Sequence, residues 1–318
     1  MTVNLQILGN SRSASRSLSV AKPWLGAALL CGLVANPVFA AEQISIEHDD
    51  RQLVGHMQMA DGADLSDGVV VIVHGTLAHG QMEITRSMQQ LLTEAGLNAL
   101  TINLSYGLDA RTGMYDCDVT HRHRHEDGAE EVAAWVDWLE GQSVGPVNVV
   151  GHSRGGNNVA WYLADFQHDS VEKAVVLAPA TWEEGREIAQ YHATYDADLN
   201  AILAQAQAYV DEGKPEQVME LDFLYCPETT ATAESVLSIY QENPRMNTPD
   251  LLTETQTPTL VIIAGDDQTV TDLDEQMQPV LHYEHIHVDE VIGADHMFMD
   301  LFLYDAVDMT VDFFAGND

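Results

Sequence analysis

The stretch "VNVVGHSRGGNN" (147–158) constrains the fold of this chain more than any other. Its β-branched apolar run predicts a buried strand, and the continuation "NNVAWYLADF" predicts a helix. Between them, Gly151 and Gly155 flank Ser153 in a Gly-x-Ser-x-Gly pattern. A nucleophile on a sharp strand-to-helix turn needs small neighbours, because bulky side chains would clash there. The pattern predicts that Ser153 is a catalytic nucleophile, and the alternative is a tight turn without a catalytic role.

Buried strands alternate with helical segments along most of the chain. Continuous apolar runs are typical of strands that a parallel sheet buries on both faces, and they occur at 68–75, 98–104, 146–151, 173–179 and 258–265. We therefore expect an α/β fold with a doubly wound, mostly parallel sheet. Near the start, 43–48 and 53–59 alternate apolar with polar residues, which predicts an antiparallel hairpin at the edge of that sheet.

The alternation stops between about residues 181 and 257. Here 196–213 and 232–244 have the pattern of amphipathic helices, without buried strands between them. We interpret this segment as a helical cap inserted into a sheet domain that spans residues 41–318. The last apolar segment, 297–315, predicts a terminal helix.

The first 40 residues are typical of a secretory signal peptide. They carry three basic residues and no acidic ones, and the apolar run 24–35 is too short to anchor the chain across a bilayer. Small residues before position 41 predict cleavage after Ala40, and hence a periplasmic or secreted protein without a membrane span. A lipid anchor on Cys31 is the weaker alternative, because the preceding Leu29 and Leu30 are large.

The chain is strongly acidic, with 50 Asp and Glu residues against 13 Lys and Arg and a net charge of −37. Such a charge disfavours nucleic acids and anionic membranes as partners, because basic side chains supply the affinity for both. It is consistent with solubility in a saline habitat, where salt screens the repulsion between like charges. The charge does not indicate an oligomeric state.

Two cysteines, Cys117 and Cys226, remain after the expected cleavage. In an oxidising compartment they could pair, and the alternative is two buried free thiols. Such a disulfide would tether the cap to the sheet domain.

The chain resembles the α/β-hydrolase superfamily, in particular its serine esterases and serine aminopeptidases. "GHSRGG" matches the nucleophile turn, and the resemblance implies an acid and then a histidine further along the chain. In "IIAGDDQTV" it implies Asp267 as the acid, with Asp266 as the alternative because the loop is one residue shorter than usual. In "GADHMFMD" it implies His296 as the base.

The resemblance also implies an oxyanion hole made of two backbone amides. One belongs to Arg154, directly after Ser153, and the other to Thr76 in "VVVIVHGT". Leu77 is the alternative to Thr76. The implied activity is acyl transfer to water on a small-molecule substrate, with cleavage of a carboxylic ester or a related acyl bond and no cofactor.

Other readings use the same residues. A peptidase, thioesterase or acyltransferase would have the same triad and differ in its pocket, and a non-catalytic relative would use the pocket to bind a ligand. The sequence leaves the pocket undetermined, and with it the acyl-chain length.

A run of histidines, "THRHRHED" (120–127), could hold a metal if it were extended, because His121, His123 and His125 would share one face. We favour structural pairing with the cap, then contact with a carboxylate-bearing substrate, and a metal last. We likewise expect His74 and His152 to support the site structurally.

Overall fold

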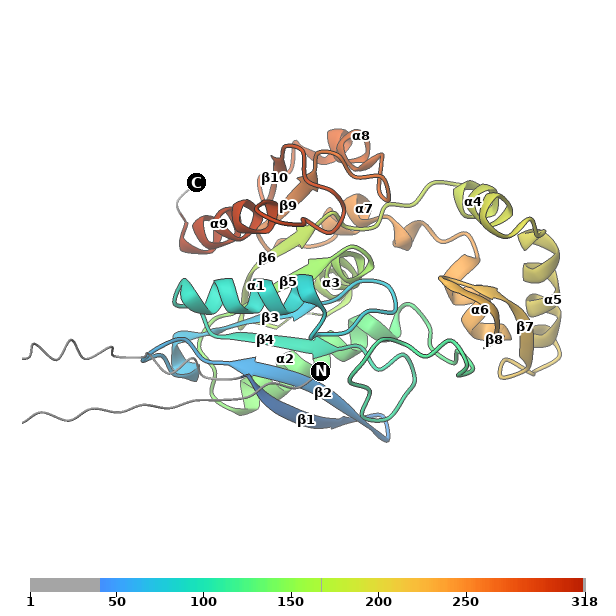
Figure 1. Cartoon of the computed structure of the whole chain (residues 1–318), viewed down its shortest axis with the longest axis horizontal. Helices are drawn as coiled ribbons and strands as arrows, with labels where there is room; N and C mark the ends of the chain where they lie inside the picture. The colour runs from blue at the N-terminus through green and yellow to red at the C-terminus, as the bar shows by residue number, and fades with distance from the viewer. Residues whose placement is uncertain (1–40, 167, 317–318) are drawn as a thin grey trace, which may run out of the picture. The chain divides into compact units, whose positions relative to one another are not determined.

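A computed structural model describes residues 41–166 and 168–316 of the chain (Figure 1). The predicted signal peptide, residues 1–40, lies outside the described residues. Within the described part, no helix combines the length and the apolar character that a membrane span needs.

An eight-stranded sheet forms the centre of the fold, in the order β1-β2-β4-β3-β5-β6-β9-β10. β2 pairs antiparallel with both β1 and β4, and all other neighbouring strands pair parallel. The expected edge hairpin and the mostly parallel sheet are therefore both confirmed. The strands are β1 (Glu42–His48), β2 (Arg51–Gln58), β3 (Val69–Val73), β4 (Ala99–Asn103), β5 (Val147–His152), β6 (Val171–Leu177), β9 (Thr259–Ala264) and β10 (Ile286–Val291).

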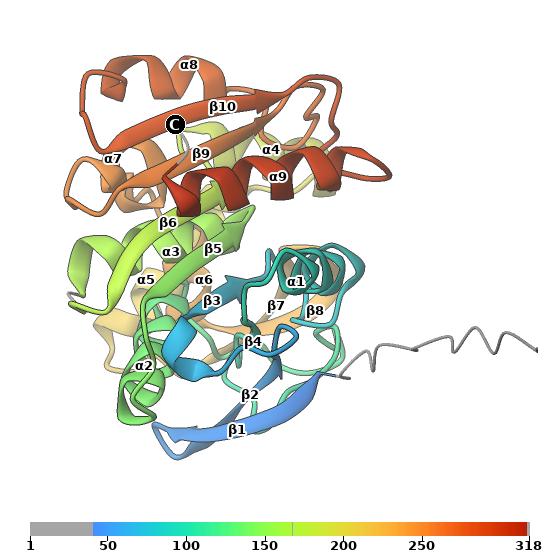
Figure 2. The same cartoon turned by 90° about the vertical axis from the view of Figure 1, so that its left-hand side faces the viewer.

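Helices cover both faces of this sheet, as Figure 2 shows. On one face α1 (Glu83–Glu94) and α9 (Phe302–Ala315) pack together, and on the other α2 (Asp127–Gly141) packs against α3 (Arg154–Asp165). The strand β3, "VVVIV", is buried along its whole length because it lies between these two layers. Short helices complete the sheet domain: α7 (Thr248–Leu252), α8 (Leu273–Met277) and the 3-10 turns at Leu65–Asp67, Pro244–Met246 and Gln278–Val280.

A second, smaller core lies in the segment inserted between β6 and β9. It contains α4 (Arg186–Tyr195), α5 (Leu199–Asp211) and α6 (Ala233–Tyr240), which lie beyond the carboxyl ends of the parallel strands (Figure 1). The segment also contains an antiparallel hairpin, β7 (Val218–Phe223) and β8 (Cys226–Thr232). We call the residues from Arg186 to Tyr240 the cap.

The cap differs from the sequence expectation in two respects. It is not purely helical, because Met219, Leu221 and Phe223 alternate with polar residues and bury one face of the hairpin. The cap also ends before the expected boundary at residue 257, since Met246 and α7 pack into the core of the sheet domain beside α3.

Candidate active site

Ser153 occupies the sharp turn between β5 and α3. Its backbone has φ 56° and ψ −126°, in a region that non-glycine residues rarely adopt. The neighbouring strand β6 holds this turn, because the Ser153 N–H donates to Leu177 O at 2.9 Å and the Ser153 carbonyl accepts from the Ala180 N–H at 3.1 Å. The side chain is thereby fixed at the amino end of α3.

The two glycines of the motif are required by close backbone contacts. A Cβ atom on Gly151 would lie 2.4 Å from the carbonyl oxygen of Gly155, and one on Gly155 would lie 2.3 Å from the carbonyl oxygen of His74. Both contacts are with backbone atoms, so a side chain could be accommodated only by moving the turn itself. The steric reason for the Gly-x-Ser-x-Gly pattern is therefore present in this chain.

His296 and Asp267 complete a hydrogen-bonded chain with Ser153. The Nε2 atom of His296 lies 2.9 Å from Ser153 Oγ, and its Nδ1 atom lies 2.7 Å from Asp267 Oδ2. Asp266, the alternative acid, is exposed, and its carboxylate makes no hydrogen bond with His296. The structure thus brings together the three residues that the sequence singled out and places Asp267 next to the imidazole.

The environment of Asp267 favours its ionised form. Burial by itself raises the pKa of this carboxyl group, but hydrogen bonds from His296 and from two backbone amides outweigh burial, so the pKa lies below its ordinary value. The two amides belong to Thr269 and Val270, which donate to Oδ1 at 2.7 and 3.0 Å. An ionised Asp267 selects the tautomer of His296 that carries its proton on Nδ1 and leaves Nε2 free to accept.

Two further histidines support this arrangement structurally. His152 Nε2 donates to the carbonyl oxygen of His296 at 2.7 Å, and burial lowers the pKa of His152 to about 4. His74 is buried, donates from Nδ1 to Gly75 O at 2.8 Å, and accepts at Nε2 from the Leu104 N–H at 3.0 Å. Burial also lowers the pKa of His74 well below its ordinary value, so both rings are neutral. His152 lies beside the loop that carries His296, and His74 lies beneath the turn after β3.

The backbone amides of Thr76 and Arg154 are available beside Ser153. Among the hydrogen bonds of residues 41–166 and 168–316, none uses either N–H as a donor. The N–H of Leu77, in contrast, donates to Tyr106 Oη at 3.1 Å, and this hydroxyl donates in turn to Gly75 O. Of the two alternatives, Thr76 is therefore the residue with a free amide. Tyr106 itself was not singled out by sequence reasoning, because no local pattern marks it.

A small cavity opens above Ser153, between the sheet domain and the cap. Its volume is about 220 Å³, and Thr76, Ser153 and Arg154 line its floor. Most other lining residues come from the cap and carry polar groups, including Arg186, Glu187 and four tyrosines. Sequence reasoning could not identify these lining residues, because they reach the site only through the packing of the insertion.

Residues 68–279 match a family model described as the alpha/beta hydrolase fold. This chain belongs to the α/β-hydrolase family. The matched range includes Ser153 and Asp267 and ends before His296. Comparison with curated proteins gives no significant match.

Solved structures of other α/β-hydrolases are similar to this one over most of its length. Est1E from Butyrivibrio proteoclasticus is 17% identical, covers 86% of this chain and 98% of its own, and has a TM-score of 0.60. GrgF from Penicillium sp. sh18 is 14% identical, covers 86% of this chain and 97% of its own, and has a TM-score of 0.61. A dienelactone hydrolase from Anabaena variabilis is 17% identical, covers 87% of this chain and 97% of its own, and has a TM-score of 0.54. At these identities the likeness shows the fold alone.

The histidine run of this α/β-hydrolase docks the cap. His121 pairs with the hairpin, since its N–H donates to Thr230 O at 2.8 Å and its carbonyl accepts from the Thr232 N–H at 2.9 Å. Arg122 points outward and pairs with Glu216 at 2.7 Å. These contacts correspond to the favoured structural interpretation of the run.

The three histidine side chains point inward and are buried. His121 stacks on Tyr115 with ring centroids 4.3 Å apart, and both of its ring nitrogens lack a hydrogen-bond partner in the described part of the chain. Burial lowers the pKa of His121 to about 4 and that of His123 well below its ordinary value. His125 Nε2 lies 2.6 Å from Asn157 Oδ1. The three rings do not join any of the groups of three metal-ligand side chains found among the described residues.

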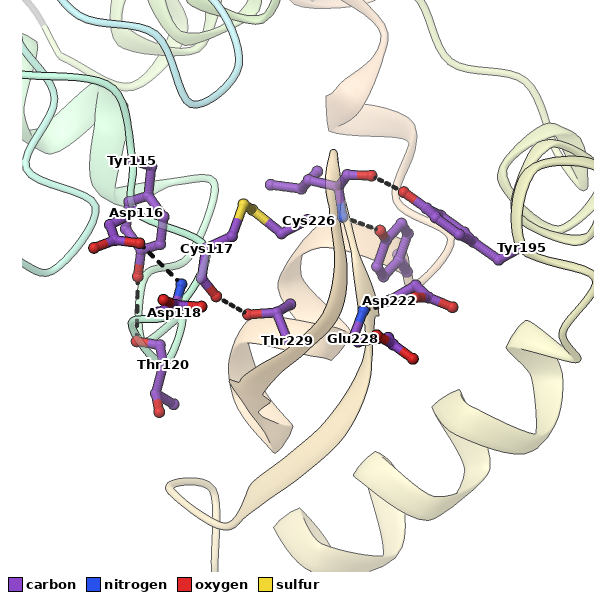
Figure 3. The surroundings of a disulfide bond; sticks show 12 residues. Tyr115, Asp116, Cys117, Asp118, Thr120, Tyr195, Asp222, Cys226, Glu228 and Thr229 are labelled. Atoms are coloured by element: carbon purple, nitrogen blue, oxygen red, sulfur yellow. Dashed lines mark hydrogen bonds between the residues drawn. A yellow bond between two sulfur atoms is a disulfide. The ribbon is translucent and has the colours of Figure 1, made fainter.

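A disulfide joins Cys117 of this α/β-hydrolase to Cys226 at the start of β8 (Figure 3). The Thr229 hydroxyl donates to the carbonyl oxygen of Cys117 at 2.6 Å, so a hydrogen bond reinforces the link. On the other side of the hairpin turn, Tyr240 Oη accepts from the Leu224 N–H at 2.6 Å. The bridge thus fastens the hairpin of the cap to the loop that leads into the histidine run.

Proposed function

We propose that this protein is a serine hydrolase that cleaves a carboxylic ester or a related acyl bond. The observation that carries the proposal is the continuous hydrogen-bonded chain from Ser153 through His296 to Asp267, with distances of 2.9 and 2.7 Å. A serine hydroxyl is a weak nucleophile at neutral pH, and an adjacent oriented base is what activates it. The family to which the chain belongs supports a hydrolase.

In the proposed reaction Ser153 Oγ attacks the acyl carbon while its proton moves to His296 Nε2. Asp267 keeps the imidazole in the required tautomer and stabilises the imidazolium. His296 then protonates the leaving group, which departs and leaves an acyl group on Ser153. Water then gives a proton to His296 while its oxygen attacks the acyl carbon. As the bond between this carbon and Ser153 Oγ breaks, His296 returns the proton to Oγ, so the acid leaves and the enzyme returns to its initial state.

The negative charge that develops on the carbonyl oxygen would be stabilised by the backbone N–H groups of Thr76 and Arg154. Both amides are uncommitted among the described residues, and both residues line the cavity with Ser153. Each such donor contributes about 3 kcal/mol to transition-state stabilisation. The amino end of α3 adds a partial positive charge at the same place.

The cavity supports a small ester as the substrate. Its volume of about 220 Å³ is below the range of pockets that hold drug-sized ligands. Of the described residues that line it, only Ala180, Leu224 and Val270 have purely aliphatic side chains. A long acyl chain would need a longer apolar channel. We therefore favour a carboxylesterase over a lipase.

We further propose that the protein is periplasmic or secreted after cleavage near Ala40. The disulfide between Cys117 and Cys226 supports this location, because disulfides persist in oxidising compartments.

Hydrolysis of 4-nitrophenyl esters of graded chain length tests the proposed activity. We expect cleavage of the acetate and butyrate esters, a decline for longer chains, and a loss of several orders of magnitude in kcat for Ser153→Ala. The control is Ser45→Ala, at an exposed position on the edge strand, which should behave as the wild type. Hydrolysis that survives in Ser153→Ala would contradict the proposal.

A further inference from the structure

The two arginines that line the active-site cavity have different surroundings. Arg186 has a carboxylate partner, since it pairs with Asp272 Oδ2 at 2.6 Å, and it also donates to Thr181 Oγ1 at 3.1 Å. Arg154 donates only from Nε, to Thr76 Oγ1 at a long 3.3 Å. No ion pair of Arg154 occurs among residues 41–166 and 168–316. The four N–H bonds at the end of its guanidinium group therefore have no protein acceptor there.

An unpaired arginine inside a pocket is unexpected in this chain. Acidic residues outnumber basic ones by 50 to 13, so a carboxylate partner is available for most cations. Burial of charge without a partner costs free energy, and Arg154 is partly buried where it lines the cavity over Ser153 and two smaller hollows next to it. Glu187 also lines the cavity but forms no ion pair with Arg154. A planar guanidinium with free donors is suited to bind a carboxylate through two parallel hydrogen bonds.

We propose that the Arg154 side chain binds a carboxylate group of the substrate, so that the enzyme acts on half-esters of short dicarboxylic acids. This inference rests on the proposed function. It gives Arg154 two separate roles, because its backbone N–H faces the oxyanion while its side chain selects the substrate. A monoanion fits the cavity better than a doubly charged phosphate, since Glu187 contributes a negative charge to the same small space.

The geometry limits the distance between the two ends of such a substrate. Arg154 follows Ser153 directly, and its Nε contacts the side chain of Thr76, whose amide belongs to the proposed oxyanion hole. The free carboxylate and the ester carbonyl must therefore be a few atoms apart. The positive charge of Arg154 gives an anion a local partner in a protein of net charge −37, because a cavity concentrates the field of the charge that lines it.

The test compares monomethyl glutarate with dimethyl glutarate, which share a chain and a leaving group and differ in charge. Methanol release gives kcat/KM for each ester. We expect the wild type to prefer the monoester, and Arg154→Gln to lower the ratio of monoester to diester about tenfold or more, mainly through KM. Arg154→Lys should give an intermediate ratio, because it keeps the charge and loses the two-pronged geometry.

The matched control is Arg122→Gln, which removes the same charge from an exposed residue outside the cavity. Its ratio should equal that of the wild type. Each variant is also checked for an unchanged thermal unfolding curve. A wild type that prefers the diester, or an Arg154→Gln ratio equal to the wild-type ratio, would overturn the inference.

A second measurement separates this inference from the proposed function. The rate at which a fluorophosphonate labels Ser153 is measured with glutarate or with the neutral glutaramide as competitor. Glutarate should slow labelling more than glutaramide in the wild type but not in Arg154→Gln. Equal slowing by both compounds overturns the carboxylate site and leaves the proposed function intact, whereas an absence of labelling contradicts both.

Discussion

His152 Nε2 donates a hydrogen bond to the carbonyl oxygen of His296 at 2.7 Å, although 144 positions separate the two residues. The residue before the proposed nucleophile thus holds the backbone of the loop that carries the proposed base. We assign His152 a positioning role.

The variant His152→Phe tests this role, because phenylalanine fills a similar volume without a donor. We expect kcat to fall about tenfold, which corresponds to the loss of one buried hydrogen bond. His152→Gln, which keeps an N–H donor, should recover part of the loss. Steady-state kinetics on a short-chain ester checks this, and equal kcat values for both variants and the wild type would disprove the role.

Asp267 and Asp266 offer an adjacent pair for testing the proposed acid. Asp267→Asn keeps the shape of the side chain but favours the wrong tautomer of His296, so we expect kcat to fall by about 10³- to 10⁴-fold. Asp266→Asn changes an exposed neighbour and should have little effect. If the Asp266 variant were the inactive one, the assignment from the hydrogen bond at 2.7 Å would be wrong.

Burial of His121 predicts a loss of stability in acid. Burial lowers the pKa of His121 from 6.5 to about 4. Between these pH values the unfolded chain binds a proton there and the folded chain does not, so the free energy of unfolding decreases as the pH falls through this window. Glu131 has the opposite effect, because burial raises its pKa from 4.5 to about 7. Between these pH values the folded chain binds a proton there and the unfolded chain does not, so the free energy of unfolding decreases as the pH rises.

The variant His121→Phe isolates the histidine contribution, since Glu131 is the same in both proteins. We expect the melting temperature of the variant to fall less than that of the wild type when the pH is lowered from 7 to 4.5. The exposed His282→Gln serves as control and should follow the wild type. Parallel wild-type and His121→Phe curves over this range would refute the expectation.

Removal of the disulfide should destabilise the protein. The bond closes a sequence separation of 109 residues, for which the loss of chain entropy in the unfolded state corresponds to about 5 kcal/mol. The double variant Cys117→Ser/Cys226→Ser should therefore melt at a lower temperature than the oxidised wild type. Reductant should lower the melting temperature of the wild type to that of the variant and leave the variant unchanged, and a wild type insensitive to reductant would argue against the bond.

Local signals explain why the turn at Ser153 could be predicted. The strand, the two glycines and the helix follow one another directly, and the backbone contacts that require Gly151 and Gly155 lie within the turn or directly under it. The alternation of buried strands and helices is equally local, and it predicted the sheet.

Where two adjacent residues were candidates for the same role, only the structure could decide between them. Whether Asp267 or Asp266 faces His296, and whether Thr76 or Leu77 has a free amide, depends on how a loop is seated against distant elements. The sequence contains both members of each pair, and the pattern around them is nearly the same.

Elements defined by long-range packing were predicted least well. The terminal helix was expected from residue 297, but α9 begins at Phe302, because Phe298 and Asp300 have positive φ values and turn the chain after His296. The β7–β8 hairpin was missed because its apolar residues are few and pack against the helices of the cap. That Arg154 has no carboxylate partner among residues 41–166 and 168–316 could not be recognised from sequence, since it depends on how the cavity is packed.

Fluorophosphonate labelling followed by peptide mass analysis tests the central claim most directly, because it reports whether Ser153 is an activated nucleophile without requiring the natural substrate. The account predicts stoichiometric labelling of the wild type at Ser153, strongly slowed labelling of His296→Ala, and none of Ser153→Ala. A folded wild-type protein that stays unlabelled, or that is labelled at another residue, would contradict it.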